Sequence, residues 1–95
     1  MWILRAAGAD EELLFRLRPG SIKTVGRATR ADFIVDAPLV SRLHCRLESA
    51  ADALHVIDLS STNGTFVNGK RVKRAHLQAG DRLRVGRVEL SVERT

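Results

Sequence analysis

Apolar and polar residues alternate along most of the chain in short runs that are separated by turn residues. In the run from Glu11 to Arg18, Leu13, Phe15 and Leu17 fall on one side and the arginines fall on the other. Such alternation with a period of two residues predicts half-buried β-strands. Further runs of this type span residues 2–6, 22–25, 32–35, 45–49, 53–59, 65–67, 70–72, 75–77, 81–85 and 88–92.

Turn signals separate these runs. Asn68-Gly69 lies between two short apolar-alternating segments and predicts a type I′ hairpin, and Gly86-Arg87 predicts a second hairpin with glycine leading a type II′ turn. Pro19-Gly20 also predicts a turn, which we expect to join residues 11–18 and 22–25 in a hairpin. The segment Gly8-Ala9-Asp10 is expected to interrupt the first strand-like run.

These signals together predict an all-β protein. No window shows convincing helical apolar spacing, and about ten short strands at close spacing favour a sandwich or a barrel. With no linker, repeat or low-complexity tract, residues 1–95 are expected to form a single domain. A strand that begins at Trp2 favours a natural N-terminus, whereas the close at Thr95 suits an excised domain equally well.

The composition of the chain indicates its cellular location and the charge of its partner. The apolar share of 44% is ordinary for a folded protein, and 16 Lys and Arg residues against 11 Asp and Glu residues favour an acidic partner. Cys45 is the only cysteine, so no internal disulfide can form. The chain shows neither a signal peptide nor a membrane-spanning run, and the expected location is the cytoplasm. Trp2, Phe15, Phe33 and Phe66 are expected in the core.

Three polar blocks follow strand-like runs and carry the candidate chemistry. They are Gly26-Arg27, then Ser41-Arg42-Leu43-His44, then residues 60–65 (Ser-Ser-Thr-Asn-Gly-Thr) with Asn68-Gly69 behind. A guanidinium matches two phosphate oxygens, a hydroxyl donates a hydrogen bond, and an Asn amide can bind a peptide backbone. His44 follows Ser41 by three residues, but no third group orients the imidazole for catalysis. The blocks therefore favour binding of an anionic peptide over an enzyme.

The order and the gaps of these blocks resemble the signature of the forkhead-associated (FHA) domain, and the likeness extends from Trp2 to Val92. The resemblance implies a β-sandwich of about ten to eleven short, mostly antiparallel strands, with loops at one end that bind phosphothreonine peptides. It also implies roles for individual residues. Arg27, Ser41 and Arg42 would bind the phosphate, Thr62 would contact the phosphate or the methyl-bearing carbon of the phosphothreonine, and Asn63 would bind the peptide backbone. The residues implied to support the site are Gly26, His44, Gly64, Asn68 and Gly69.

The resemblance also bears on specificity. Family members often select the third residue after the phosphothreonine, using the loop before the position of Ser41. Leu39 and Val40 stand in that loop, where some relatives carry a basic residue. We therefore expect a preference for an apolar residue at that peptide position.

Two other functions remain open at this point. A phosphate-independent interaction scaffold of the same fold would not need Arg27, Ser41 and Asn63 together. A basic β domain that binds nucleic acid would share the charge but would depend steeply on salt. The histidines and Cys45 lack metal-ligand spacing, the glycines form no nucleotide-binding fingerprint, and no cofactor is expected. The expected partner is a threonine-phosphorylated protein.

Overall fold

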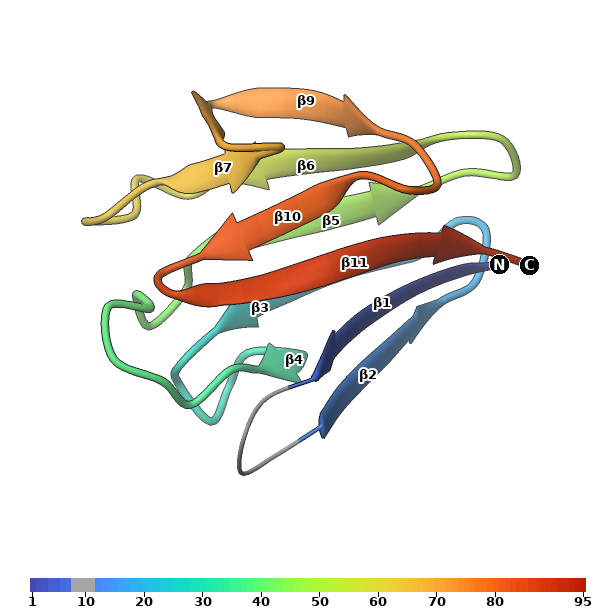
Figure 1. The fold of residues 1–95 in the computed structure, drawn as a ribbon. Coiled ribbons are helices and arrows are strands. Elements are labelled where there is room, and N and C mark those ends of the chain that lie inside the picture. Colours follow the sequence, from blue (N-terminus) through green and yellow to red (C-terminus); the bar gives the residue numbers. More distant parts are fainter. Residues whose placement is uncertain (8–11) are drawn as a thin grey trace.

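A computed structural model describes residues 1–7 and 12–95, and the expected break at Gly8-Ala9-Asp10 lies outside these ranges. Within them the chain forms strands and no helix. Two sheets face each other (Figure 1), and this confirms the expected all-β sandwich. The strands are β1 (Trp2–Ala7), β2 (Glu12–Leu17), β3 (Ile22–Gly26), β4 (Phe33–Ile34), β5 (Cys45–Ser49), β6 (Leu54–Asp58), β7 (Thr65–Val67), β8 (Lys70–Val72), β9 (Arg74–Leu77), β10 (Arg82–Val85) and β11 (Val88–Arg94).

Neighbouring strands run antiparallel with one exception. The first sheet has the order β2-β1-β11-β10-β7-β8, and the second has the order β4-β3-β5-β6-β9. Among the strands of residues 1–7 and 12–95, only β3 and β4 pair in parallel, at Val25 with Phe33 and at Gly26 with Ile34. The strands β8 and β9 are consecutive in the chain but belong to different sheets, so residue 73 carries the chain across one edge of the sandwich.

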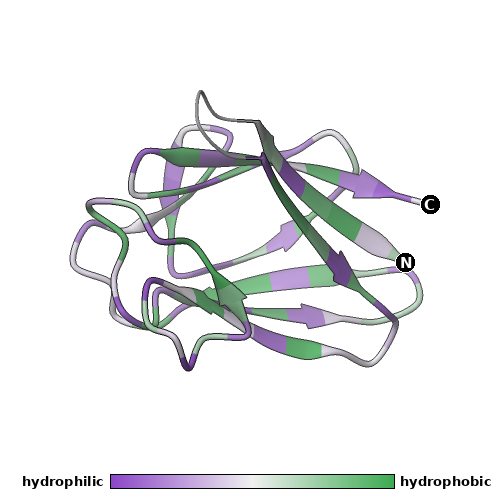
Figure 2. Cartoon of the chain, turned by 90° about the horizontal axis from the view of Figure 1, so that it is seen from below, coloured by the Kyte–Doolittle hydropathy of each residue, from purple (hydrophilic) through white to green (hydrophobic). Residues whose placement is uncertain are grey.

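The alternating pattern of the sequence corresponds to the two faces of each strand. On β5 the side chains of Cys45, Leu47 and Ser49 are buried and those between them are half-buried. Figure 2 shows the alternation of apolar and polar positions along several strands. Across the sandwich, Phe15 of β2 stacks on Phe33 of β4 with ring centroids 4.5 Å apart, so this stack helps to join the two sheets.

Two of the expected hairpins are confirmed. Asn68 and Gly69 both have positive φ, at 51° and 82°, as a type I′ turn requires, and they join β7 to β8. Gly86 has a φ of 59° and leads the two-residue turn that pairs Val85 with Val88.

Two other expectations are wrong. Pro19-Gly20 forms a turn, with Ser21 N–H bonded to Arg18 O, but β2 and β3 belong to different sheets and make no hairpin. The N–H of Gly20 donates to Ser49 O at 2.8 Å, which directs the chain onto β5. Phe66 does not join the core, because it lies half-buried beneath the guanidinium of Arg84, 4.0 Å from the ring centroid.

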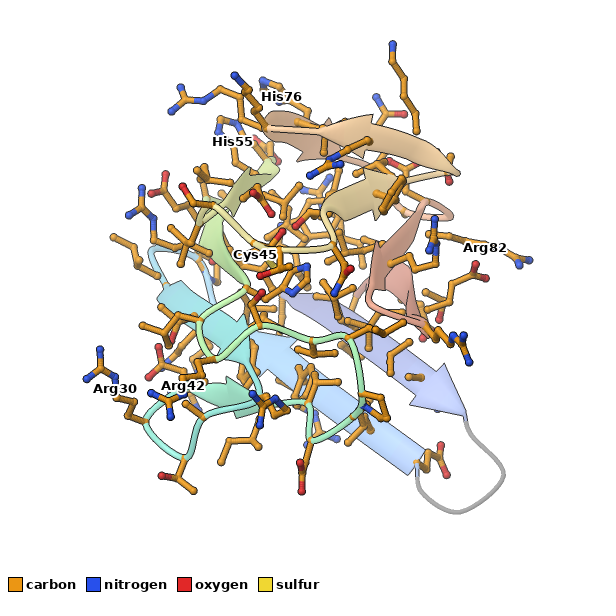
Figure 3. All side chains as sticks on the ribbon, turned by 90° about the vertical axis from the view of Figure 1, so that its left-hand side faces the viewer. Arg30, Arg42, Cys45, His55, His76 and Arg82 are labelled. Atoms are coloured by element: carbon orange, nitrogen blue, oxygen red, sulfur yellow. The ribbon has the colours of Figure 1, made fainter. Side chains whose placement is uncertain are left out.

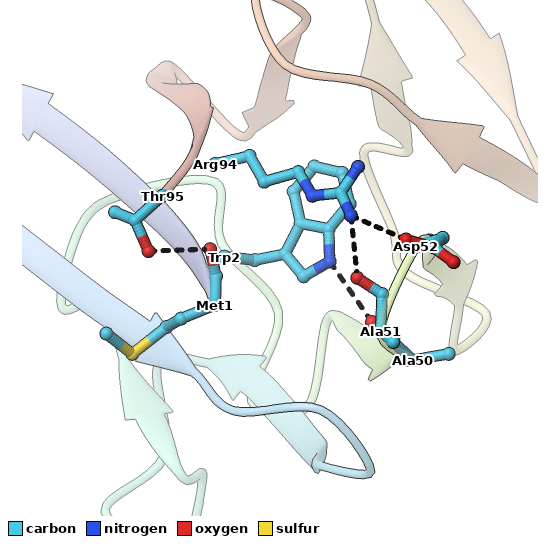
Figure 4. A network of polar contacts seen from close by, with 7 residues as sticks. All are labelled: Met1, Trp2, Ala50, Ala51, Asp52, Arg94 and Thr95. Carbon is cyan, nitrogen blue, oxygen red and sulfur yellow. Dashed lines mark hydrogen bonds and ion pairs between the residues drawn. The ribbon is translucent and has the colours of Figure 1, made fainter.

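A polar network fastens the end of the molecule where the termini lie (Figure 4). Arg94 donates to Ala51 O at 2.9 Å and to Asp52 at 2.7 Å, and its guanidinium lies over the ring of Trp2. The Trp2 indole N–H donates to Ala50 O. These contacts join the β5–β6 turn to β1 and β11 of the other sheet. In the part of the chain that the structure describes, no helix is long and apolar enough to cross a membrane.

The core makes a direct prediction about stability. Leu47 is fully buried at the centre of β5, so Leu47→Ala should lower the free energy of unfolding by about 2–5 kcal/mol. Ile22→Ala, at a strand position that is 64% exposed, should change it by less than about 0.5 kcal/mol. Chemical denaturation of both variants measures the difference. Equal losses would contradict the assignment of the two faces.

Candidate functional site

The three polar blocks meet at one end of the sandwich. They occupy the segments that leave β3, precede β5 and join β6 to β7, at the end opposite the two termini (Figure 1). An open groove of about 710 Å³ lies between these segments. Its lining residues are Arg27, Pro38, Leu39, Val40, Ser41, Arg42, Leu43, Ser60, Thr62 and Asn63.

Gly26 sets the position of Arg27. A Cβ at residue 26 would lie 2.0 Å from Arg42 O, so only glycine permits this close approach of two backbone segments. Arg27 N–H then donates to Ser41 O at 2.9 Å. The side-chain Nε of Arg27 donates to Val40 O at 3.1 Å. Its two terminal nitrogens have no hydrogen bond to the residues described, and they remain available to an anion in the groove.

Further hydrogen bonds join the segment before β5 to the β6–β7 loop. The Ser41 hydroxyl accepts from Thr62 N–H at 3.1 Å, which leaves the hydroxyl proton free to donate. The Asn63 side-chain amide donates to Leu39 O at 3.1 Å. Thr62 and Asn63 are both exposed in the groove. The groove therefore offers a hydroxyl, an amide and a guanidinium from three separate segments.

His44 joins the same two segments from beneath. Its imidazole is fully buried, Nδ1 accepts from Ser41 N–H at 3.0 Å, and Nε2–H donates to Gly64 O at 2.8 Å. Because both ring nitrogens are bonded to the backbone, the ring holds the two loops at a fixed separation. Gly64 has a φ of 91°, in the left-handed region that favours glycine.

Asp58, at the end of β6, organises the β6–β7 loop. It accepts hydrogen bonds from the hydroxyls of Ser61 and Thr65 and from Ser61 N–H, and the Ser61 hydroxyl in turn accepts from Gly64 N–H. Partial burial alone would raise the pKa of Asp58, but these hydrogen bonds outweigh it and hold the pKa below its usual value. The loop is therefore held in place by these hydrogen bonds when Asp58 is ionised.

Two residues of the groove have an unusual backbone conformation. Leu39 and Ser60 have φ values of 70° and 58°, and neither is glycine. Left-handed conformations cost bulky residues roughly 1 kcal/mol. Strain of this kind tends to persist where surrounding structure enforces it, often at functional sites. Both residues line the groove.

The two residues expected to set specificity differ in exposure. Leu39 is 45% exposed and presents apolar surface in the groove. Val40 is 3% exposed and packs in the core, and its carbonyl accepts from Arg27. Leu39 is therefore the side chain of the pair that a ligand can contact.

Arg42 and Arg30 extend the basic surface beside the groove. A hollow of about 580 Å³ is lined by Arg27, Arg30, Arg42 and their neighbours, so it continues directly from the groove. Figure 3 views the molecule toward this end and shows Arg30 and Arg42 extending near each other from the ribbon. The loop that carries Arg30 is fastened by Asp32, which accepts hydrogen bonds from the Thr24 N–H and hydroxyl.

Asn68 and Gly69 lie apart from the groove. They form the β7–β8 turn, where the Asn68 amide donates to Asp81 and accepts from Arg82 N–H. Sequence reasoning placed Leu43 and Ser60 in the polar blocks without assigning them a role, and it did not single out Pro38, which lines the groove, or Arg30 beside it. The Asp58 network did have a local signal, because an Asp at the start of a loop often accepts hydrogen bonds from backbone N–H groups just after it.

The arrangement of these side chains suits binding of an anion. Cys45 is buried, and burial, together with the nearby Asp58 charge, raises the pKa of its thiol to about 12, so it is a poor nucleophile. No cluster of three or more His, Cys, Asp or Glu side chains able to hold a metal ion occurs in residues 1–7 and 12–95. His44 uses both ring nitrogens for the backbone.

Comparison with known proteins identifies relatives of this chain. The FHA domain family model matches residues 23–86. The ABC transporter ATP-binding/permease protein Rv1747 of Mycobacterium tuberculosis is 39% identical over 74 residues, which are 78% of this chain and 8% of that protein. The chain spans 42–47% of the length of seven other curated relatives.

Solved structures agree over almost the whole chain. The FHA domain of FhaA, complexed with the intracellular domain of Rv3910, has a TM-score of 0.89 and 31% identity and covers 98% of this chain and 100% of that chain. An FHA domain solved in a study of phosphothreonine-dependent interactions has a TM-score of 0.84 and 31% identity, with 99% of this chain and 95% of that chain covered.

The Asp58 network predicts a pH-dependent loss of stability. Because its pKa is lower in the folded chain than in the unfolded chain, Asp58 stabilises the fold above about pH 4, and this contribution is lost as pH falls toward the folded-state pKa. Asp58→Asn should lower the free energy of unfolding at pH 7 by about 1.5–3 kcal/mol and should flatten the acid limb. Urea denaturation from pH 7 to pH 3 measures both effects. An unchanged acid limb in the variant would contradict this role.

Proposed function

The chain belongs to the FHA domain family, and on that premise we propose that it is a binding module for threonine-phosphorylated peptides. One observation carries the proposal: Arg27, Ser41, Thr62 and Asn63, which come from three segments, line a single groove. A phosphothreonine brings a charge of about −1.5 to −2 and three acceptor oxygens. The groove offers donors for those oxygens without requiring any change in the fold.

The phosphate would lie against Arg27 and Ser41. The terminal nitrogens of the Arg27 guanidinium form a planar pair of donors, while its Nε remains bonded to Val40 O and orients the side chain. Ser41 would donate its hydroxyl proton, Thr62 would add a second hydroxyl, and Arg42 would add charge from the rim. Three or four such hydrogen bonds, less ordering costs, fit a dissociation constant of about 1 μM.

Asn63 would bind the backbone of the peptide. In the free protein its amide donates to Leu39 O, a bond that an incoming peptide carbonyl can replace. The side chain is therefore held near its binding position before the ligand arrives, which reduces the entropy lost on binding. His44 and Gly26 would act from beneath, by keeping the loops in place.

Leu39 would contact the side chain of the third residue after the phosphothreonine. Its exposed side chain in the groove supports a preference for an apolar residue there. The partner is thus proposed as a threonine-phosphorylated protein that is met in the cytoplasm, consistent with one buried free cysteine. The module would bind and not catalyse.

The binding prediction compares two basic residues. Arg27→Ala should weaken binding of a phosphothreonine peptide by roughly 2–4 kcal/mol, because the bound phosphate loses a two-pronged cationic donor. Lys70→Ala removes the same charge from the exposed β8 edge and should cost less than about 0.5 kcal/mol. An oriented phosphothreonine peptide library selects the peptides that bind best. Isothermal titration calorimetry with those single peptides then measures the loss of binding free energy in each variant.

Matched peptides complete the test. Phosphoserine and unphosphorylated versions should bind much more weakly than the phosphothreonine version. Binding that is indifferent to the phosphate and to Arg27 would reject the proposal in favour of a phosphate-independent scaffold. Equal effects of Arg27 and Lys70, with steep salt dependence, would instead favour binding of nucleic acid.

A further inference from the structure

A second basic hollow lies on the other side of the β6–β7 loop. The segment Lys70 to Arg74 contains four cationic residues and crosses from β8 to β9 at the edge of the sandwich. Next to it is a hollow of about 830 Å³. It is lined by Ile57, Asp58, Ser60, Ser61, Arg71, Val72, Lys73 and Arg74.

The three cations of this hollow are exposed and make no ion pair within the described ranges. Four other arginines do make ion pairs, namely Arg5, Arg46, Arg82 and Arg94. The single carboxylate in the lining, Asp58, already accepts hydrogen bonds from Ser61 and Thr65. The hollow therefore keeps a net positive charge, because three cations face the one carboxylate of Asp58.

This hollow lies next to the groove that is proposed to bind the phosphothreonine. Ser60 lines both, so the β6–β7 loop forms a wall between them. Arg71 packs against the same loop, with its Nε 2.7 Å from the place where a Cβ of Gly64 would lie. His44 holds Gly64 from the other side. A peptide bound by Asn63 at this wall has only the width of one loop to cross.

We propose that Arg71, Lys73 and Arg74 form a second anion site, which binds an acidic or phosphorylated side chain of the same phosphothreonine peptide. The inference rests on the proposed function and adds to it a second recognised group. Arginine offers a planar donor pair and lysine a mobile point charge, and the two together suit a carboxylate or a phosphate. Five residues of extended peptide span roughly 17 Å, more than half of the smallest 26 Å extent of the molecule.

The test places one acidic residue at a time in a neutral phosphothreonine peptide, at about five positions on either side of the phosphothreonine. Binding to the wild type is compared with binding to the double variant Lys73→Gln/Arg74→Gln. Lys70→Gln serves as the matched control, since Lys70 belongs to the same basic segment but does not line the hollow. Arg71 is left intact because it packs against Gly64. Thermal denaturation checks that each variant is folded.

We expect Glu at one or two positions to strengthen binding to the wild type and to Lys70→Gln by about two- to fivefold. The double variant should lose this gain and keep its affinity for the neutral phosphopeptide. Phosphoserine in place of that Glu then distinguishes the two sources of negative charge: a larger gain assigns the site to a second phosphate, and an equal or smaller gain assigns it to a carboxylate.

Two results would overturn the second site: the double variant keeps the full gain from Glu, or the gain is as large in peptides that carry unphosphorylated threonine. Binding of the neutral phosphopeptide that depends on Arg27 would in each case leave the proposed function standing. Absence of phosphate-dependent binding in the wild type would reject both proposals together.

Discussion

The buried imidazole of His44 is the constraint on which the rest of the site depends. It accepts a hydrogen bond from the backbone at Ser41 and donates one to the backbone at Gly64, and these residues belong to the two loops that form the groove. An unpaired polar group at a fully buried position would be costly, so the ring enforces both bonds at once. The loops are therefore held at a set distance even without a ligand.

The two sheets provide the stable core of the molecule, and the loops at one end form the groove. The sandwich buries its apolar side chains and fixes the strand ends, and the Arg94 network secures the end opposite the groove. At the other end the chain leaves regular structure, and left-handed backbone occurs at Leu39 and Ser60. The β6–β7 loop is supported from both sides, by Asp58 and by Arg71. It separates the groove from the basic hollow that Arg71, Lys73 and Arg74 line.

Local signals in the sequence predicted much of the fold, and they were wrong where the answer depends on distant residues. Alternation located the strands, and Asn68-Gly69 specified its turn because the required φ values are local properties. Pro19-Gly20 predicted a turn correctly, but the partner of the following strand depends on Ser49, far along the chain. The motif blocks located Arg27 and its neighbours, whereas the position of Arg71 and Lys73 beside the β6–β7 loop required the three-dimensional structure.

The most direct measurement of the central claim is an NMR titration of the isotopically labelled protein with a phosphothreonine peptide. If one groove between the loops binds the phosphate, amide shifts should concentrate at residues 26–28, 39–44 and 60–64, and the His44 ring should keep its tautomer throughout. Shifts spread over the outer faces of the sheets, or equal shifts with the unphosphorylated peptide, would contradict the account.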